Sequence, residues 1–197
     1  MTFKSENKPN HQLQRTAKNL PPLNSVLGRN GKCLNAEKNK MKPSVYMEST
    51  IPSYYSARSG RDIISLARQE ITRIWWENHR EKYDVYISQL VFEECSQGDT
   101  DYSEKRINLL KEFPVLSLND DVVSLAEKIL ARKVIPAKAA DDATHIAVAC
   151  VYETDFLLTW NFKHIANAHI IKQLREIVEK EGYLFPVIAT PEELIGE

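Results

Sequence analysis

Glycine and cysteine are scarce in this sequence, which has six Gly and three Cys among 197 residues. The chain contains neither a GxGxxG nor a GxxxxGK[ST] segment, which argues against a nucleotide-binding or phosphotransfer protein of those types. Cys33, Cys95 and Cys150 are far apart and form no CxxC pair. A disulfide framework or a structural zinc site is therefore not expected, and the cysteine content fits a reducing cytoplasm.

Long apolar runs are also missing. No segment approaches the roughly 18 uninterrupted apolar residues of a membrane-spanning helix. The polar N-terminus lacks the apolar stretch of a secretory signal. These two absences predict a cytoplasmic protein with no membrane association.

The net charge of −1 conceals an uneven distribution. Residues 1–44 carry nine Lys or Arg against two Glu, whereas the rest of the chain carries 17 basic and 25 acidic residues. A body with this acidic excess does not attract phosphate groups through its net field. If it handles nucleic acid, it needs a metal ion or a local basic patch.

Residues 1–40 differ in composition from everything that follows. They are rich in Asn, Lys, Gln and Pro and show no sustained helical or strand period, so they cannot bury enough apolar surface to offset the entropy of ordering. We expect them to be a disordered tail or a spurious N-terminal extension upstream of a start at Met41. An RNA-binding tail is a third interpretation. The remaining residues, 42–197, are predicted to form one domain.

Within this domain, short apolar runs alternate with amphipathic segments. The runs predict five strands, at Val45–Met47, Val85–Ser88, Val115–Leu118, Phe156–Thr159 and Val187–Ala189. Helices are expected at Arg61–Trp76, Leu90–Ser96, Ser103–Phe113, from Asp120 or Asp121 as cap to about Arg132, from Asp141 and Asp142 through Tyr152, at Ile170–Glu181, and from Pro191. In the first helix, the residues at helical spacing are Ile63, Ala67, Ile71, Ile74 and Trp75.

Strands that alternate with helices, and that are apolar throughout, indicate an α/β fold with a parallel sheet covered on both faces. The active site of such a sheet lies beyond the carboxyl ends of its strands. Glu48 follows the first predicted strand, Glu94 lies in the helix after the second, Asp142 opens the helix before the fourth, and Thr159 and Asn161 lie at the end of the fourth. Because clustered carboxylates repel one another, their gathering requires a cation. Oxygen ligands favour Mg²⁺ or Mn²⁺.

Four segments together resemble the PIN domain, and most closely the VapC-type toxins of bacterial toxin–antitoxin pairs. They are VYMEST at 45–50, Ser88-x5-Glu94-x3-Gly98, DATHIA at 142–147 and LLTWN at 157–161. They occur in order over roughly residues 44–195. Any one of them is a weak signal, but four in register are a strong one.

The resemblance implies a three-layer α/β/α sandwich that holds Mg²⁺ or Mn²⁺ on Glu48, Glu94 and Asp142 and hydrolyses RNA phosphodiester bonds. It also implies a cognate antitoxin and a homodimer. Asn161 and Thr159 would position water or phosphate. Two positions depart from the family pattern, since Glu48 stands where Asp is usual and Asn161 where Asp is common. The second departure removes one charge, so one metal is expected and a second metal site is in doubt.

Each of these residues also has an ordinary structural explanation. Asp142 or its neighbour Asp141 would be a normal helix cap, and Glu94 an ordinary solvated helix residue like Glu93. Asn161 would shape a turn. Glu48 has the strongest case for function, because a carboxylate at the end of an apolar strand has little structural reason to be there.

Histidine, tryptophan and arginine residues near these segments also have structural interpretations. We interpret His145 as a hydrogen-bonded core histidine rather than a ligand, and Trp75 and Trp76 as core or interface residues. His164 and His169 follow the fourth strand and are candidates for contact with phosphate, although no motif requires it. The best basic patch consists of Arg58, Arg61, Arg68 and Arg73, which is typical of a solvated helix face.

Two functions therefore remain open. The first is a metal-dependent endoribonuclease, the toxin of a toxin–antitoxin pair. The second is a catalytically weak or inactive PIN domain that binds RNA or protein without cutting, for which Asn161 is the support.

Overall fold

A five-stranded parallel sheet forms the centre of the domain. The computed structural model describes residues 42–60 and 62–196. The strands are β1 (Ser44–Met47), β2 (Asp84–Ser88), β3 (Val115–Leu116), β4 (Phe156–Leu158) and β5 (Val187–Ala189). They lie in the order β3-β2-β1-β4-β5, and every neighbouring pair is parallel. The predicted parallel α/β sheet is confirmed.

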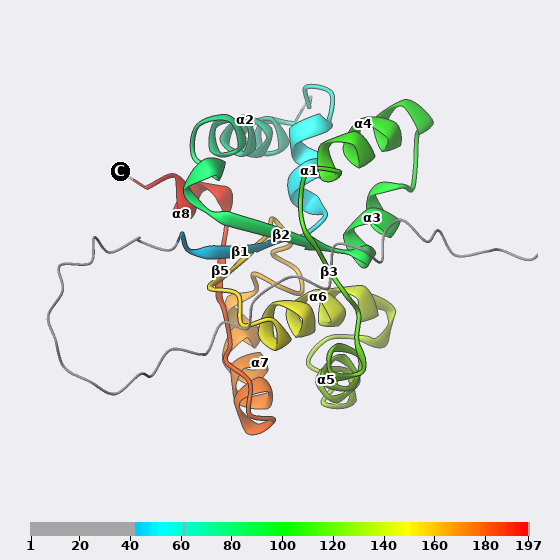
Figure 1. The fold of residues 1–197 in the computed structure, drawn as a ribbon, viewed down its shortest axis with the longest axis vertical. Helices are drawn as coiled ribbons and strands as arrows, with labels where there is room; N and C mark the ends of the chain where they lie inside the picture. Colours follow the sequence, from blue (N-terminus) through cyan, green and yellow to red (C-terminus); the bar gives the residue numbers. More distant parts are fainter. Residues whose placement is uncertain (1–41, 61, 197) are drawn as a thin grey trace, which may run out of the picture. The chain divides into compact units, whose positions relative to one another are not determined.

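Helices cover both faces of this sheet (Figure 1). One group contains α1 (Thr50–Ser56), α2 (Ile63–Asn78), α4 (Thr100–Leu110) and α8 (Pro191–Ile195), and the other contains α5 (Asp120–Ala131), α6 (Ala140–Val151) and α7 (Ala168–Lys180). Helix α3 (Gln89–Cys95) follows β2 and packs on α4. Short 3-10 turns lie at Arg80–Lys82 and Ala137–Ala139. This is the three-layer α/β/α arrangement.

The strand order places a topological switch beside β1. Along the chain, β1 is followed by β2 on one side, whereas its other neighbour is β4. The main-chain N–H of Glu48, just past β1, donates to the carbonyl of Leu158 at 3.2 Å. In open α/β sheets, ligand sites lie outside the carboxyl ends of the strands at such a switch. The ends of β1 and β4 are therefore where a site is expected.

The sequence pattern predicts no helix at α1, because a proline such as Pro52 shortly after an apolar strand is typical of a strand end. In the structure Pro52 is the third residue of α1. The first backbone N–H groups of a helix have no partner inside it, so proline is tolerated in the first turn. The chain thus passes directly from β1 through Glu48 into a helix.

Other element ends differ modestly from the predictions. Helix α4 begins at Thr100, three residues before the expected start, because Asp99 caps it by accepting from the Tyr102 amide. The expected cap of α5 was wrong. Asn119 fills that position through the Val122 amide, while Asp120 and Asp121 lie in the first turn, where the helix dipole favours acidic side chains. Strand β3 is shorter than Val115–Leu118.

The apolar residues at helical spacing in α2 do not coincide with its buried face. Of the five, Trp75 is buried and Ile71 packs partly buried against the core, whereas Ile63 is 80% exposed. The buried side chains of α2 are Gln69, Thr72, Trp75 and Trp76. Both tryptophans are core residues, as interpreted from the sequence. The helix therefore carries an exposed apolar surface, formed by Ile63, Ile64, Leu66 and Ile74.

The predictions for residues 1–40, and the predicted helix start at Arg61, lie outside the described residues. In the described ranges, helix α2 begins at Ile63, and Asp62 caps it by accepting from the Ser65 amide at 2.8 Å. No described helix is long and apolar enough to cross a bilayer.

We expect Leu157→Ala to lower the free energy of unfolding by about 2–5 kcal/mol, because it leaves a cavity at the centre of the sheet. Leu157 is fully buried in β4. Urea denaturation of the two proteins measures the difference. Leu184→Ala is the matched control, since Leu184 is 69% exposed and should change stability little. Equal losses at the two positions would contradict the assigned core.

Candidate active site at the carboxyl edge of the sheet

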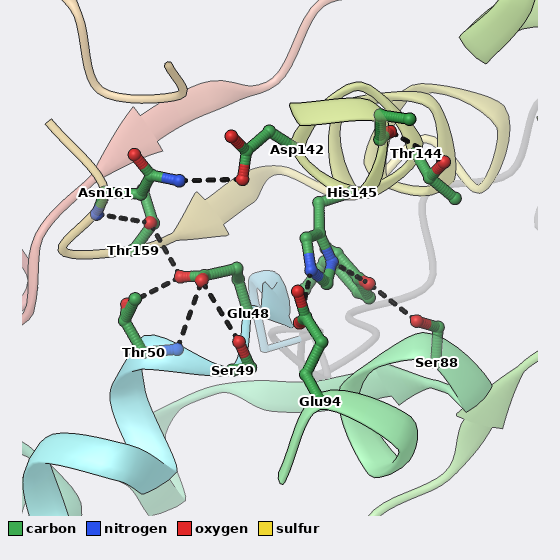
Figure 2. Close-up of polar contacts among 12 residues, drawn as sticks. Glu48, Ser49, Thr50, Ser88, Glu94, Asp142, Thr144, His145, Thr159 and Asn161 are labelled. Atoms are coloured by element: carbon green, nitrogen blue, oxygen red, sulfur yellow. Dashed lines mark hydrogen bonds and ion pairs between the residues drawn. The ribbon is translucent and has the colours of Figure 1, made fainter. Parts of the chain in front are cut away.

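The structure gathers the predicted acidic residues at the carboxyl edge of the sheet (Figure 2). Glu48 directly follows β1, and Glu94 lies in α3 after β2. Asp142 is in the first turn of α6, which leads into β4. Asn161 follows β4. Parallel strands bring their carboxyl ends to one edge, so residues far apart in sequence meet there.

Glu48 is almost fully buried, at 3% exposure, and both its carboxylate oxygens are hydrogen-bonded. Oε1 accepts from the Thr50 amide at 3.1 Å and from the Ser49 hydroxyl at 3.4 Å. Oε2 accepts from the hydroxyls of Thr50 at 2.6 Å and Thr159 at 2.7 Å. A carboxylate has about four acceptor positions. The protein itself therefore occupies the acceptor capacity of Glu48.

Burial raises the pKa of the Glu48 carboxyl above its usual range. The charge of His145 and the hydrogen bonds from Thr50 and Thr159 act in the opposite direction and offset only part of this effect. A buried carboxylate is tolerable only with such partners. Glu48 thus depends on the hydroxyls around it.

Thr159 is fully buried, and its hydroxyl is engaged on both sides. It donates to Glu48 and accepts from the Asn161 amide at 2.8 Å. Its observed contact is thus with Glu48, and a direct contact with substrate or water stays a prediction. Thr159 acts here by holding a carboxylate and the turn after β4.

The side chain of Asn161 is also engaged at both ends. Its Oδ1 accepts from the amides of Lys163 and His164, at 3.2 and 3.1 Å, which is the turn-forming role of asparagine. Its Nδ2 donates to Asp142 at 2.8 Å. Asn161 therefore both shapes the turn and contacts an acidic residue of the site.

Asp142 lies between two donors. Its Oδ1 accepts from Asn161 and its Oδ2 lies 2.7 Å from Nδ1 of His164. Neither Asp142 nor Asp141 caps α6, whose N-cap position is Ala139 without a side-chain hydrogen bond. The capping explanation for Asp142 is therefore excluded. Its side chain remains 17% exposed, and each oxygen keeps acceptor capacity.

Glu94 is joined to a buried hydrogen-bond chain. Its Oε2 lies 2.8 Å from Nε2 of His145. Nδ1 of His145 lies 2.8 Å from the Tyr46 hydroxyl, which lies 2.7 Å from the Ser88 hydroxyl. Glu94 itself is 24% exposed at its side chain. This series of hydrogen bonds thus connects Ser88 and Tyr46, inside the sheet, to the Glu94 carboxylate at its edge.

His145 is hydrogen-bonded to Glu94, and the charges of Glu48 and Asp142 also act on it. Burial lowers the pKa of its imidazole, but the hydrogen bond and charge of Glu94 and the charges of Glu48 and Asp142 outweigh burial, so the net shift is upward. The pKa of Glu94 moves the other way. Burial raises it, and the hydrogen bond and charge of His145 outweigh this and lower it. The interpretation of His145 as a hydrogen-bonded core histidine agrees with its full burial.

The oxygen donors fit Mg²⁺ or Mn²⁺. Such ions take one or two carboxylates and complete their coordination with water and substrate phosphate. Asp142 and Glu94 are partly exposed and retain acceptor positions, whereas Glu48 would have to release a hydroxyl donor. Among residues 42–60 and 62–196, no group of three or more His, Cys, Asp or Glu side chains is arranged to hold a metal. A three-carboxylate site therefore stays a prediction.

Four residues of this network were not assigned to the site from the sequence. Tyr46 and Ser88 lie inside predicted strands, and the sequence alone shows no partner for His145 or His164. Their spacing in sequence from the acidic residues is the pattern that could have assigned two of them to the site. Tyr46 precedes Glu48 by two residues, so the two lie on the same side of β1. His145 follows Asp142 by three and shares its helix face.

The basic patch is mostly engaged with the protein. Arg68 lies over the rings of Trp160 and Phe162, at 5.6 and 4.9 Å from their centroids. Arg73 pairs with Glu70, and Arg58 lies over Tyr102. Arg61 lies outside the described residues. This agrees with a solvated helix face more than with a phosphate-binding cluster.

The geometry defines a three-layer α/β/α domain with acidic residues at the carboxyl edge of its parallel sheet. No family model and no curated protein match the chain. Among solved structures it is similar to the VapBC2 complex of Rickettsia felis bound to promoter DNA, at 13% identity over 74% of this chain and 98% of that one, with a TM-score of 0.43. It is also similar to VapC20 of Mycobacterium tuberculosis, a toxin that cleaves the sarcin–ricin loop, at 16% identity over 64% and 95%, with a TM-score of 0.50. The likeness to VapC20 shows that the chain has the fold of a VapC toxin.

Thr159→Val should lower the free energy of unfolding by about 1–3 kcal/mol, because it leaves the Asn161 amide and one position on Glu48 without a partner. The two side chains have the same shape, so packing is preserved. Chemical denaturation measures the change. Thr100→Val is the control, since Thr100 is exposed at the start of α4. If both substitutions proved neutral, the Thr159 hydroxyl would not be holding Glu48.

Proposed function

We propose that this protein is a metal-dependent endoribonuclease of the VapC toxin type, which hydrolyses phosphodiester bonds in RNA. One observation carries the proposal. Glu94 of α3, Asp142 of α6 and buried Glu48, just past β1, are brought together at the carboxyl edge of the sheet. Like charges are gathered in this way where a cation is to be bound. The fold shared with VapC20, an RNA-cleaving toxin, supports the same assignment.

Mg²⁺ or Mn²⁺ is the proposed cofactor, held by Asp142 and Glu94, with Glu48 as the third acidic residue. When bound, such an ion supplies positive charge to the phosphate and lowers the pKa of a water molecule. Asp142 and Glu94 are the better placed ligands because their side chains are 17% and 24% exposed and keep acceptor positions. Glu48 contributes negative charge from the interior.

The other residues prepare this site. Thr159 holds Glu48, and Asn161 holds Asp142 while closing the turn after β4. In the proposed mechanism an acceptor position that Glu94 or Asp142 keeps available orients the attacking water for in-line displacement, since the Glu48 oxygens are already occupied by donors.

We propose a cognate antitoxin and a second copy of this chain as protein partners. The exposed apolar surface of α2, which contains Ile63 and Ile64 at 80% and 59% exposure, supports a protein partner on that face. Contiguous exposed apolar residues are typical of interaction sites.

Asn161 favours a second candidate function, a PIN domain that binds RNA or protein without cutting it. The amide stands where the family commonly has a fourth acid, and it donates to Asp142 rather than adding charge. Incubation with structured RNA hairpins in Mn²⁺ separates the two functions. Cleavage that EDTA abolishes supports the nuclease, whereas retention of intact RNA supports the binding module.

We expect Asp142→Asn to reduce metal-dependent cleavage by at least about 100-fold, because it removes a negative ligand from the site. Gel analysis of RNA hairpins in Mn²⁺ measures the rate, and circular dichroism checks folding. Asp141→Asn is the matched control. It removes the same charge from the same helical turn, but Asp141 is exposed. Equal activity in the two variants would remove Asp142 from the mechanism.

Asn161→Asp tests how the site tolerates a fourth carboxylate. It replaces a donor with an acceptor 2.8 Å from Asp142, so in EDTA we expect a loss of about 1–3 kcal/mol in unfolding free energy. Mn²⁺ should stabilise this variant more than the wild type, because the added charge raises affinity for the ion. Urea denaturation with EDTA or Mn²⁺ gives both quantities. Asn108→Asp, an equal charge change on the exposed side of α4, should show neither effect.

A further inference from the structure

We propose that His164 and His145 are positioning residues, each of which fixes one metal-binding carboxylate by donating an N–H to it. His164 would orient Asp142, and His145 would orient Glu94. The inference rests on the proposed function, since it concerns the same acidic site. It assigns a task to two histidines that the hydrolytic mechanism does not otherwise use.

His164 is held rigidly where it meets Asp142. Its backbone amide donates to Asn161 Oδ1 at 3.1 Å, and the next residue, Ile165, is fully buried. The side chain is 16% exposed, and Nδ1 lies 2.7 Å from Asp142 Oδ2. Asn161 Nδ2 reaches the other oxygen, Oδ1, at 2.8 Å. Two residues of the short turn after β4, Asn161 and His164, therefore contact both carboxylate oxygens of Asp142 in α6.

His145 is held equally firmly, by a different pair of contacts. Its ring is fully buried, with Nε2 on Glu94 and Nδ1 on the Tyr46 hydroxyl, both at 2.8 Å. The Tyr46 hydroxyl also contacts Ser88, the N-cap residue of the helix that carries Glu94. The ring can neither rotate nor flip without losing one of these bonds. Glu94 is thus aligned with β1 and α6 as well as with its own helix.

The direction of the hydrogen bond to each carboxylate follows from its chemistry. An ionised carboxylate only accepts, so Nε2 of His145 and Nδ1 of His164 must carry the protons. This holds whether the rings are neutral or charged. Each histidine consumes one acceptor position and leaves the others on Asp142 and Glu94 directed away from it. Residues of this kind fix the orientation of metal-binding groups in many sites.

The two histidines use different ring nitrogens, and this permits a crossed test. The amide of Asn reaches the position of Nδ1, and the longer Gln reaches the position of Nε2. His164→Asn should therefore preserve the bond to Asp142, while His164→Gln and His164→Ala should lose it. At position 145 the order should reverse, with Gln preserving the bond to Glu94 and Asn losing it. A role in packing alone would not invert the order.

The measured quantity is Mn²⁺ affinity of the full chain, obtained by electron paramagnetic resonance without RNA. We expect His164→Ala and His164→Gln to weaken binding by about 10–100-fold, the usual effect of removing such a partner. His164→Asn should stay near the wild type. His169→Ala is the control, because His169 is exposed a few residues further along the chain. His145 variants are compared in the same way once circular dichroism shows that they fold.

Equal affinity in all three His164 variants, or loss in His164→Asn as large as in His164→Ala, would overturn the proposal. So would tighter binding in His164→Ala, which would identify the histidine as a competing cation. A wild-type chain that binds no Mn²⁺ would also overturn it. Because RNA is absent, a protein that binds Mn²⁺ with the expected order but cuts no RNA would refute the nuclease and leave the positioning role supported.

Discussion

The buried carboxylate of Glu48 is the constraint on which the site depends. An ionised group removed from water is tolerated only if hydrogen bonds replace its hydration. Here the replacements come from Ser49 and Thr50, where α1 begins, and from Thr159, where β4 ends. Thr50 in turn accepts from the Trp160 amide. The ends of two neighbouring strands are thus joined through one side chain, and Thr159 extends this connection to Asn161 and Asp142.

The acidic residues divide into two groups by their contact with water. Glu48 is buried and hydrogen-bonded at all its acceptor positions, whereas Asp142 and Glu94 are partly exposed to solvent and keep lone pairs available. An interior charge acts on the site through its field, which is weakly screened there. The open carboxylates can exchange partners with an ion or a water molecule. Glu48 therefore belongs to the structural framework of the site, whereas Asp142 and Glu94 keep acceptor positions exposed to solvent.

Much of the architecture was predictable because it follows from local patterns. Apolar runs gave the positions of the five strands, and residues after parallel strands had to meet at one edge, which located Glu48, Glu94, Asp142 and Asn161. What could not be predicted depends on partners distant in sequence. The buried face of α2 is set by Thr72, which accepts from the Trp160 indole, so a polar residue is inside while Ile63 is outside.

The histidines show the same limit. Periodicity places His145 on the inner face of α6, but only the sheet brings Tyr46 and Glu94 to its two nitrogens. Helix α1 is not predictable for a local reason. A proline in the first turn of a helix cannot be distinguished in sequence from a proline that ends a strand. Without α1, the sequence does not show that the Thr50 amide donates a hydrogen bond to Glu48.

The parallel pairing of β1 has one more consequence. Tyr46 lies opposite Tyr86 of β2 and Leu157 of β4, and Glu48 comes two residues later. Because side chains alternate along a strand, sliding β1 by a single position would turn the phenol and the carboxylate together toward the opposite helical layer. The polar contacts and the hydrophobic packing thus require the same alignment, and a sheet in the wrong register would lose both its acidic edge and its core.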